Sequence, residues 1–395
     1  MKKSHYASYL IAATVVAVLF TVLAIFVGMH RDAKQPEAAS KVPAAEVAPT
    51  PEPEPITITI AATGDTLPHT PVNRSALAYG GGTSYDYAPM FVDIAPVLQE
   101  ADLAICRLET PLTKTNTNLS RPDLLIFNTP HELTAGLKSA GYDACDFACN
   151  HTMDQGMAGL AATEEIVRAA GLGYAGPSAN PDRAGKAEFL TAGNAKVAHL
   201  AYTYTFPNDW GPNTKLPPDA PWLAANSWPI QGSQGIIEQA EEAKEAGADF
   251  VVVSLHWGVE YQREPTAEQR QLAKELLESP AVDLILGAHA HVVQPCEQIN
   301  GKHVIYGMGN SLSNQSPRVL STLAPDTQDG MIAIFTLTKD PAGTVTTQMR
   351  YQPTFVELAG HVVRRVSPST NAPSWQRTVQ AVESLGGCSA TAVHP

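Results

Sequence analysis

Short apolar runs recur along the chain, and each one ends at a cluster of polar residues. The first run, residues 56–62 (ITITIAA), alternates apolar and polar positions, is rich in β-branched residues and leads directly into Thr-Gly-Asp, as expected of a strand. The later runs stand in ADLAICRLET, YDACDFACNH, KVAHLAYTY, DFVVVSLHWG, VDLILGAHAH and HVIYGMGN. Helical patterns lie between these runs, at residues 88–100, 131–140, 159–170, 235–246 and 266–278.

Strands that alternate with helices predict an α/β protein whose strands are largely parallel and buried. In such folds, ligands bind outside the carboxyl ends of the strands. The polar clusters of this chain fall at those ends, so we expect a functional site there. The segment 207–229, rich in Trp and Pro, is predicted to be an irregular excursion that could border or cover the site. Thr266 and Gln269 form a plausible capping box at the start of the last helix.

Composition limits the classes of partner. The 395 residues are 44% hydrophobic and only 16% charged, which indicates a globular chain with one large core or two ordinary domains. The formal charge of -13 argues against nucleic acid, or any other polyanion, bound by a broad basic surface. An anionic ligand would therefore need another source of positive charge, such as a metal ion.

The N-terminal residues form a separate region. Residues 9–29 carry no charge and are long enough to cross a bilayer core of about 30 Å. They exceed the apolar region of a secretory signal, about 7 to 15 residues, and no small-residue cleavage site follows them, so we expect an uncleaved transmembrane anchor after a short tail, residues 1–8. The positive-inside count is nearly tied, but a short tail before a single span is the usual signal-anchor arrangement. We therefore predict a single-pass protein of the cell membrane whose large domain is extracytoplasmic.

The rest of the chain divides into three parts. Residues 30–55 are rich in Pro, Ala and Glu, cannot form a core and are expected to be an extended spacer. The folded domain is predicted to cover residues 56–365. The tail, residues 366–395, is rich in Ser, Pro and Ala and is expected to be weakly ordered.

Five cysteines do not suggest a disulfide framework in a domain of this size. Cys145 and Cys149 are predicted to lie on one strand, where four steps of about 3.3 Å hold them too far apart to bridge. We expect both to be core residues. Cys106 lies in another predicted strand and could meet either one, and the odd count leaves at least one thiol unpaired.

Seven residues at the predicted strand ends form the candidate site. Carboxylates, an amide and imidazoles at one sheet edge supply oxygen and nitrogen donors suited to Mn, Fe or Zn. Each residue alone also fits a simpler structural role, such as a turn, a cap, a pair between Glu109 and Arg107, or a hydrogen-bonded core histidine. Their occurrence together, each at the end of its own strand, favours one site. They are Asp65, Glu109, Asn150, His151, His256, His289 and His291.

His289 and His291 flank one alanine after a predicted strand. Alternate residues of an extended segment face the same side, so both imidazoles are expected to reach a metal site.

The order of these motifs resembles that of the CapA family, the poly-γ-glutamate capsule synthesis proteins, whose fold is similar to that of calcineurin-like metallophosphoesterases. The resemblance covers roughly residues 56–356 and is carried by TGD, Glu-Thr-Pro, NHTMDQG, HWGVEY, GAHAHVVQP and YGMGNSLSN. It implies a four-layer α/β/β/α sandwich with a site for two divalent metal ions.

The resemblance also implies a role for each residue. Asp65 and His291 would bind the first metal, and Glu109 would bridge the two metals. The second metal would be held by Asn150, His256 and His289. His151 would be the acid that faces the substrate, oriented by Asp154, and Glu260 would be a further outer partner.

The chain departs from the family pattern at the first metal. Metallophosphoesterases usually have Asp-x-His at the first motif, but Leu67 stands at the histidine position, and we do not expect His69 to replace that ligand. The Asn-x-Glu and Asn-Asn-His of CapA relatives are here Arg107-x-Glu and Cys149-Asn-His. The first metal site therefore lacks a ligand, whereas the second has its full set.

Three functions fit these observations. The first is a membrane-anchored, metal-dependent hydrolase that acts on an amide of an anionic polymer such as poly-γ-glutamate, or on a phosphoester. The second is a non-catalytic subunit that assembles or anchors the polymer beside membrane-bound synthase subunits. The third is a metallophosphoesterase with a small substrate, which fold analogy alone supports.

Overall fold

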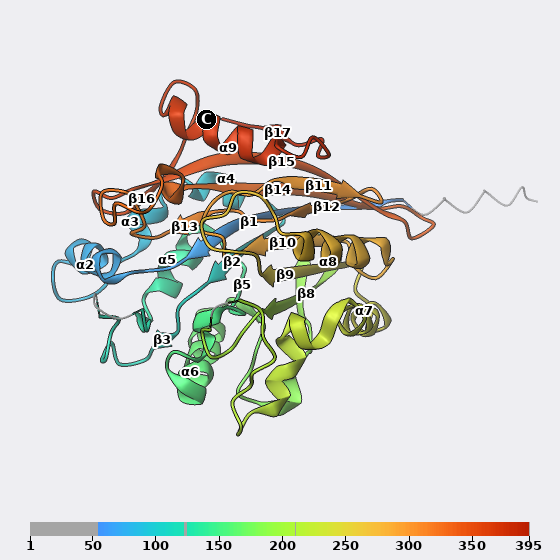
Figure 1. Cartoon of the computed structure of the whole chain (residues 1–395), viewed down its shortest axis with the longest axis horizontal. Coiled ribbons are helices and arrows are strands. Elements are labelled where there is room, and N and C mark those ends of the chain that lie inside the picture. The colour runs from blue at the N-terminus through green and yellow to red at the C-terminus, as the bar shows by residue number, and fades with distance from the viewer. Residues whose placement is uncertain (1–53, 122–124, 210, 395) are drawn as a thin grey trace, which may run out of the picture. The chain divides into compact units, whose positions relative to one another are not determined.

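Two β-sheets lie face to face at the centre of the protein in a computed structural model, which describes residues 54–121, 125–209 and 211–394 (Figure 1). The larger sheet has the order β16-β15-β14-β1-β2-β5-β6, with β13 beside β1 and β17 beside β15. Its strands are β1 Ile56–Thr66, β2 Leu103–Leu108, β5 Ala144–Asp146, β6 Gly173–Ala175, β13 Asn310–Leu312, β14 Asp329–Lys339, β15 Val345–Glu357, β16 Val362–Arg365 and β17 Thr391–Ala392.

The smaller sheet has the order β11-β12-β10-β9-β8-β7, and a separate short ladder pairs β3 with β4. These strands are β3 Leu112–Thr113, β4 Thr129–Pro130, β7 Glu188–Ala192, β8 Ala195–Thr203, β9 Phe250–His256, β10 Leu284–Ala288, β11 Cys296–Ile299 and β12 Lys302–Ile305. The central strands of both sheets are parallel, as predicted: β1, β2, β5 and β6 in one sheet, and β8, β9, β10 and β12 in the other.

Alternate residues of the strands supply different cores, because successive side chains of a strand point to opposite faces. In β1, Ile58 and Ile60 belong to the core between the sheets, whereas Ala61 belongs to the core under the helices that cover the larger sheet. A third core lies between the smaller sheet and α7 and α8. The layers therefore follow the order helix, sheet, sheet, helix, and the predicted α/β class is confirmed.

Most predicted helices are present. They are α3 Ala88–Phe91, α4 Ala95–Gln99, α5 Leu133–Ala140, α6 Gly156–Ala169, α7 Trp228–Glu245 and α8 Ala267–Glu278. The segment 88–100 was predicted as one helix but forms two short ones, and α2 Thr70–Tyr79 and α9 Ala372–Glu383 were not predicted. The predicted capping box is confirmed: Thr266 Oγ1 accepts from the Gln269 N–H, and the Gln269 side chain accepts from the Thr266 N–H.

The prediction of a weakly ordered tail after residue 365 is wrong. Helix α9 packs Val382 into the core between the sheets, and β17 pairs with β15 (Figure 1). An ion pair joins the partly exposed Arg377 of α9 to the buried Asp329 of β14, with Nε and Oδ2 2.6 Å apart. The tail is ordered because the apolar positions of α9 complete a core that its composition does not reveal.

The expectation that the cysteines form no disulfide framework is also wrong. Cys106 and Cys145, which face each other on β2 and β5, are bonded, and Cys296 is bonded to Cys388, 92 residues away. Cys149 is a buried free thiol, as the odd count required, but it lies beyond the end of β5.

The predicted anchor at residues 9–29 and nearly all of the predicted spacer lie outside the described residues. Within residues 54–394, apart from the few that are not described, no helix combines the length and apolar character that a membrane span needs.

Candidate metal centre

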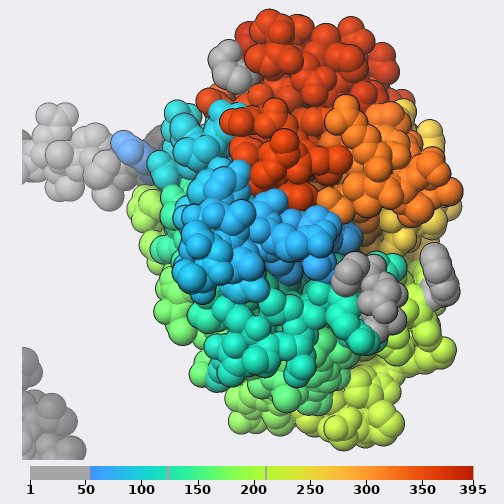
Figure 2. All heavy atoms as spheres, turned by 90° about the vertical axis from the view of Figure 1, so that its left-hand side faces the viewer, coloured from blue at the N-terminus to red at the C-terminus, as the bar shows by residue number. Residues whose placement is uncertain are grey.

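Five strand ends deliver the predicted site residues to one edge of the two sheets. Asp65 is the penultimate residue of β1, Glu109 follows β2, and His256 is the last residue of β9. Asn150 and His151 begin a 3₁₀ turn, Asn150–Met153, after β5, and His289 and His291 follow β10. Figure 2 views the side toward which these strands run, where the segment that follows β1 lies between the later strands of the larger sheet and the segments around β3.

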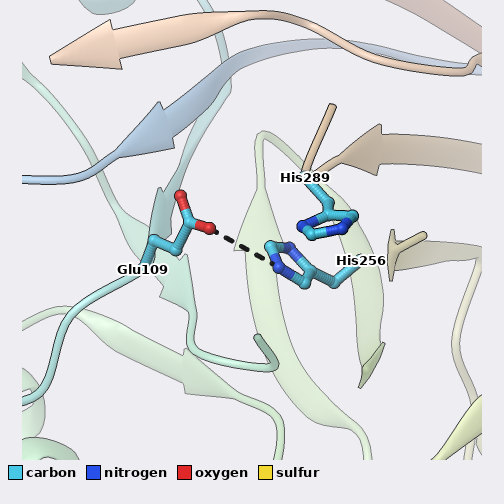
Figure 3. A group of neighbouring side chains, drawn as sticks. All are labelled: Glu109, His256 and His289. Atoms are coloured by element: carbon cyan, nitrogen blue, oxygen red, sulfur yellow. Dashed lines mark ion pairs between the residues drawn. The ribbon is translucent and has the colours of Figure 1, made fainter. Parts of the chain in front are cut away.

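The first group of donors is Glu109, His256 and His289, each of which has a ligand atom within 4.8 Å of the others. Glu109 Oε1 lies 3.5 Å from His256 Nε2, and the two imidazole rings lie 4.5 Å apart (Figure 3). Asn150 adds an oxygen, because its Oδ1 lies 2.8 Å from His256 Nε2. The four residues predicted to hold or bridge the second metal are therefore together.

The second group is Asp65, Glu109 and His291, which meets the same distance limit. His291 Nδ1 lies 3.3 Å from Asp65 Oδ2, and its Nε2 lies 3.7 Å from Glu109 Oε1. Glu109 belongs to both groups, which is the place that the resemblance predicted for a bridging carboxylate.

The buried polar atoms of this centre fit a cation. Both Glu109 oxygens, Asp65 Oδ1, and Nδ1 of His256 and of His289 are buried without a hydrogen-bond partner among the described residues. Buried acceptors without partners cost free energy unless something compensates them. Burial and the neighbouring Asp65 raise the pKa of Glu109 well above its usual value. A divalent ion beside Glu109 would favour its ionised form and compensate its two unpartnered oxygens.

The backbone after β10 differs from the prediction. His289 and His291 were expected on an extended segment, but their φ angles are 96° and 56°, and β10 ends at Ala288. Strand alternation therefore does not explain how the two rings reach the centre. A turn places them, and the His289 N–H donates to Asp65 Oδ2 at 3.2 Å.

His151 is oriented as predicted. Its Nδ1 lies 2.8 Å from Asp154 Oδ2, which also accepts from the Phe127 N–H at 2.6 Å. The Phe127 ring packs edge-on against the imidazole, with centroids 4.6 Å apart. With Nδ1 held by Asp154, Nε2 of His151 is left for another partner.

Two further predictions concern residues around the ligands. Glu260 is half-buried and close enough to Glu109 to raise its pKa, but its side chain makes no hydrogen bond or ion pair within the described part of the chain. Leu67 is buried and offers no donor. His69 Nδ1 lies 2.9 Å from the Leu67 carbonyl oxygen, and burial lowers the pKa of His69 to about 4.

Sequence reasoning missed several neighbours of the centre. The alternative in which Arg107 pairs with Glu109 is wrong, because the guanidinium contacts Asp65 and Asp146 instead. Tyr204 packs on both His256 and His289, with centroids 5.9 and 4.6 Å away, and it follows the end of β8. The rule that selects polar residues at strand ends would have found Tyr204 as well.

The predicted excursion at residues 207–229 does reach the centre. Asn208 Oδ1 accepts from Asn150 Nδ2 at 2.7 Å, which leaves Asn150 Oδ1 turned toward His256. Part of the excursion is ordered as the 3₁₀ helix Pro221–Asn226 and the start of α7.

Comparison with solved structures finds low similarity. A calcineurin-like phosphoesterase from Bacillus subtilis is 15% identical with a TM-score of 0.42, over 82% of this chain and 98% of that one. A phosphatase from Mycoplasma pneumoniae is 14% identical with a TM-score of 0.41, over 75% of this chain and 94% of that one.

Comparison with known sequences finds closer relatives. A capsule biosynthesis protein CapA from Bacillus anthracis is 28% identical over 271 residues, which are 68% of this chain and 63% of that protein. A PGA biosynthesis protein CapA from Bacillus subtilis is 27% identical over 231 residues, which are 57% of each chain. The match thus spans less than two thirds of either relative. The family model described as bacterial capsule synthesis protein PGA_cap matches residues 59–315, and the chain therefore belongs to that family.

Proposed function

We propose that this protein takes part in the synthesis, export or processing of poly-γ-glutamate or a similar anionic capsule polymer, and that its centre performs metal-dependent hydrolysis. The observation that carries the proposal is the buried set of unpartnered carboxylate and imidazole atoms around Glu109 in a member of a capsule synthesis family. The names of the two relatives above support capsule polymer as the substrate class.

The donor set decides which ions fit. Carboxylate, amide and imidazole donors without thiolate suit Mn, Fe or Zn, and a calcineurin-like site would take one or two of them. Asn150, His256 and His289 would hold an ion with Glu109, and Asp65 and His291 face it from the other side. A bound divalent ion supplies Lewis-acid polarisation of an acyl or phosphoryl oxygen and increases the acidity of water.

The protein's own residues would supply the proton transfer. His151 donates Nδ1–H to Asp154, which orients the ring and points Nε2 away from Asp154. From there, Nε2–H can protonate the leaving amine or alcohol. Phe127 holds the imidazole edge-on and limits its rotation. Tyr204 packs on His256 and His289 and helps to hold these rings in place.

The disulfides support an extracytoplasmic location. Disulfides persist in oxidising compartments and are rare in the cytosol. The pairs Cys106–Cys145 and Cys296–Cys388 therefore agree with a domain held outside the cell membrane by the apolar segment at residues 9–29. Membrane-bound synthase subunits would be the partners there.

A non-hydrolytic role in polymer assembly is the second candidate. It is favoured by the burial of the centre, because the predicted metal ligands are at most 4% exposed and His151 is only 6% exposed. A polymer chain would then bind at the rim without reaching Glu109.

The test is an assay of the purified full chain on poly-γ-glutamate and on a generic phosphodiester, with Mn²⁺ and after chelation. Metal-dependent cleavage of the polymer supports the proposal. Cleavage of the phosphodiester alone supports a phosphoesterase. Binding of the polymer without cleavage of either substrate would overturn the hydrolytic part of the proposal.

A further inference from the structure

We propose that the centre binds one divalent cation per chain, at Glu109, His256 and His289, and that the Arg107 guanidinium provides the positive charge beside Asp65. The inference rests on the proposed function, since it assumes that the centre holds metal. It assigns Arg107 a place that no motif of the sequence predicted.

Arg107 is a fixed positive charge inside the protein. Its side chain is 2% exposed, and an arginine stays protonated in proteins. Nη1 donates to Asp146 Oδ1, and Nη2 donates to the Ala148 carbonyl oxygen. Nε lies 3.5 Å from Asp65 Oδ1. The guanidinium therefore joins β1, β2 and β5 directly behind Asp65.

The oxygens of Asp65 already face donors. Oδ2 accepts from the His289 N–H at 3.2 Å and lies 3.3 Å from His291 Nδ1, while Oδ1 faces Arg107. Asp65 Oδ1 makes no hydrogen bond but faces this fixed positive charge, whereas both Glu109 oxygens lack a hydrogen-bond partner in the described structure. Glu109 is thus the carboxylate left open for a cation.

Asn310 determines which nitrogen of His291 carries a proton. Asn310 Nδ2 donates to the Thr327 carbonyl oxygen at 2.8 Å and to Gln315 Oε1 at 2.9 Å, so its Oδ1 must be the atom 3.1 Å from His291 Nδ1. An amide oxygen only accepts, and His291 Nδ1 must therefore donate. His291 Nδ1 also lies 3.3 Å from Asp65 Oδ2, so the two side chains contact each other without a metal between these atoms.

The side of the centre at Asp65 already holds a positive charge. Arg107 Nε lies 3.5 Å from Asp65 Oδ1, and both side chains are buried. A divalent ion beside Asp65 would be repelled by this guanidinium, and the repulsion is poorly screened inside the protein.

The side chain at position 67 also favours a single ion, bound on the side of His256 and His289. Leu67 is 2% exposed and lies two residues after Asp65, so this side of the centre carries an apolar group where a further ligand would be needed. The other side carries Asn150 in addition to its two histidines.

The experiment measures how many Mn²⁺ ions the full chain binds, by calorimetric titration and by metal analysis after desalting. We expect one ion per chain. Binding of two ions would overturn the inference and leave the proposed function standing, whereas binding of none would remove the metal centre and, with it, the proposed function.

Two variants locate the ion. Asp65→Asn should still bind one ion, whereas His256→Ala should bind at least about 100-fold more weakly, beyond the 10- to 100-fold loss typical of outer partners. Loss of the single ion in Asp65→Asn, with retention in His256→Ala, would overturn the assignment.

A double variant tests the role of the guanidinium. Leu67→His combined with Arg107→Asn adds a donor and removes the competing charge, so the count should rise to two ions per chain. A folded double variant that still binds one ion would contradict the proposed role of Arg107. Circular dichroism checks folding, and if the double variant does not fold, the counts for the unaltered chain and for Asp65→Asn still decide the stoichiometry.

Discussion

The two halves of the centre share Glu109 but are built on different principles. In the half with His256 and His289, both Glu109 oxygens and His289 Nδ1 have no hydrogen-bond partner in the described structure, so a cation would displace only the contact between His256 Nε2 and Asn150 Oδ1. In the half with Asp65 and His291, Asp65 lies between the fixed positive charge of Arg107 and the His291 ring, and His291 Nδ1 is bonded to Asn310. The difference teaches that proximity of ligand-type residues is not enough. Their remaining partners decide whether they bind metal or stabilise the fold.

The largest expected effect concerns His151, which follows Asn150 in the half with His256 and His289. His151→Ala should lower the turnover of the cleaved substrate by about 10²- to 10⁴-fold, because the leaving group loses its proton donor. Bound metal should stay nearly unchanged, as measured by metal analysis. His131→Ala, a histidine far more exposed to solvent, is the control. Full turnover in His151→Ala would remove the proposed acid.

The next effect concerns Arg107, in the half with Asp65 and His291. Arg107→Ala leaves Asp65 and Asp146 buried without their cation and should lower the free energy of unfolding by about 3 to 5 kcal/mol. Lys114→Ala removes an exposed ion pair with Glu165 and should cost at most about 1 kcal/mol. Denaturant titration of both variants measures the difference. Equal losses would show that Arg107 is not a structural charge.

Removal of metal should lower the stability of the protein, and this loss should depend on Glu109. At a free Mn²⁺ concentration 100 times the dissociation constant, binding should add about 2.7 kcal/mol to stability, and a chelator should abolish this gain. Thermal melting with and without the chelator measures it. In Glu109→Gln the chelator should have no effect, while Glu165→Gln, an exposed carboxylate, should respond like the unaltered chain. A chelator effect that persists in Glu109→Gln would place the ion elsewhere.

The smallest expected effect concerns Asn208, in the segment 207–229, which contacts the half with His256 and His289. Asn208→Ala removes the acceptor that orients Asn150 and should weaken Mn²⁺ binding by about 10- to 100-fold, the usual loss for an outer partner. Asn213→Ala, in the same segment but bonded to Thr205, should leave the affinity unchanged. Calorimetric titration compares the two, and similar affinities would separate Asn208 from the centre.

The sequence alone predicted which residues form the centre better than which of their side chains contact one another. Asp65, Glu109 and His256 were found because parallel strands end at a common edge, and that rule depends only on local apolar patterns. The pairing of Arg107 with Asp65 and Asp146 could not be read locally, because it depends on how β1, β2 and β5 lie next to one another. The roles of the predicted residues in binding and catalysis stay predictions.

Other errors have the same origin. The left-handed backbone at His289 and His291 depends on tertiary contacts, including the His289 N–H bond to Asp65, which lies 224 residues away. The Cys296–Cys388 disulfide and the packing of α9 join segments whose proximity no local pattern reveals. Local patterns predict strands and their ends, whereas long-range pairs decide which side chains remain unpartnered.

The most direct test is a crystal structure of the protein grown with Mn²⁺, with anomalous diffraction data collected to locate the metal. The account predicts an anomalous peak within about 2.0–2.4 Å of a Glu109 oxygen and of nitrogens of His256 and His289, the range of metal–ligand bonds. Crystals without any peak at these three side chains, although Mn²⁺ is present in excess, would contradict it.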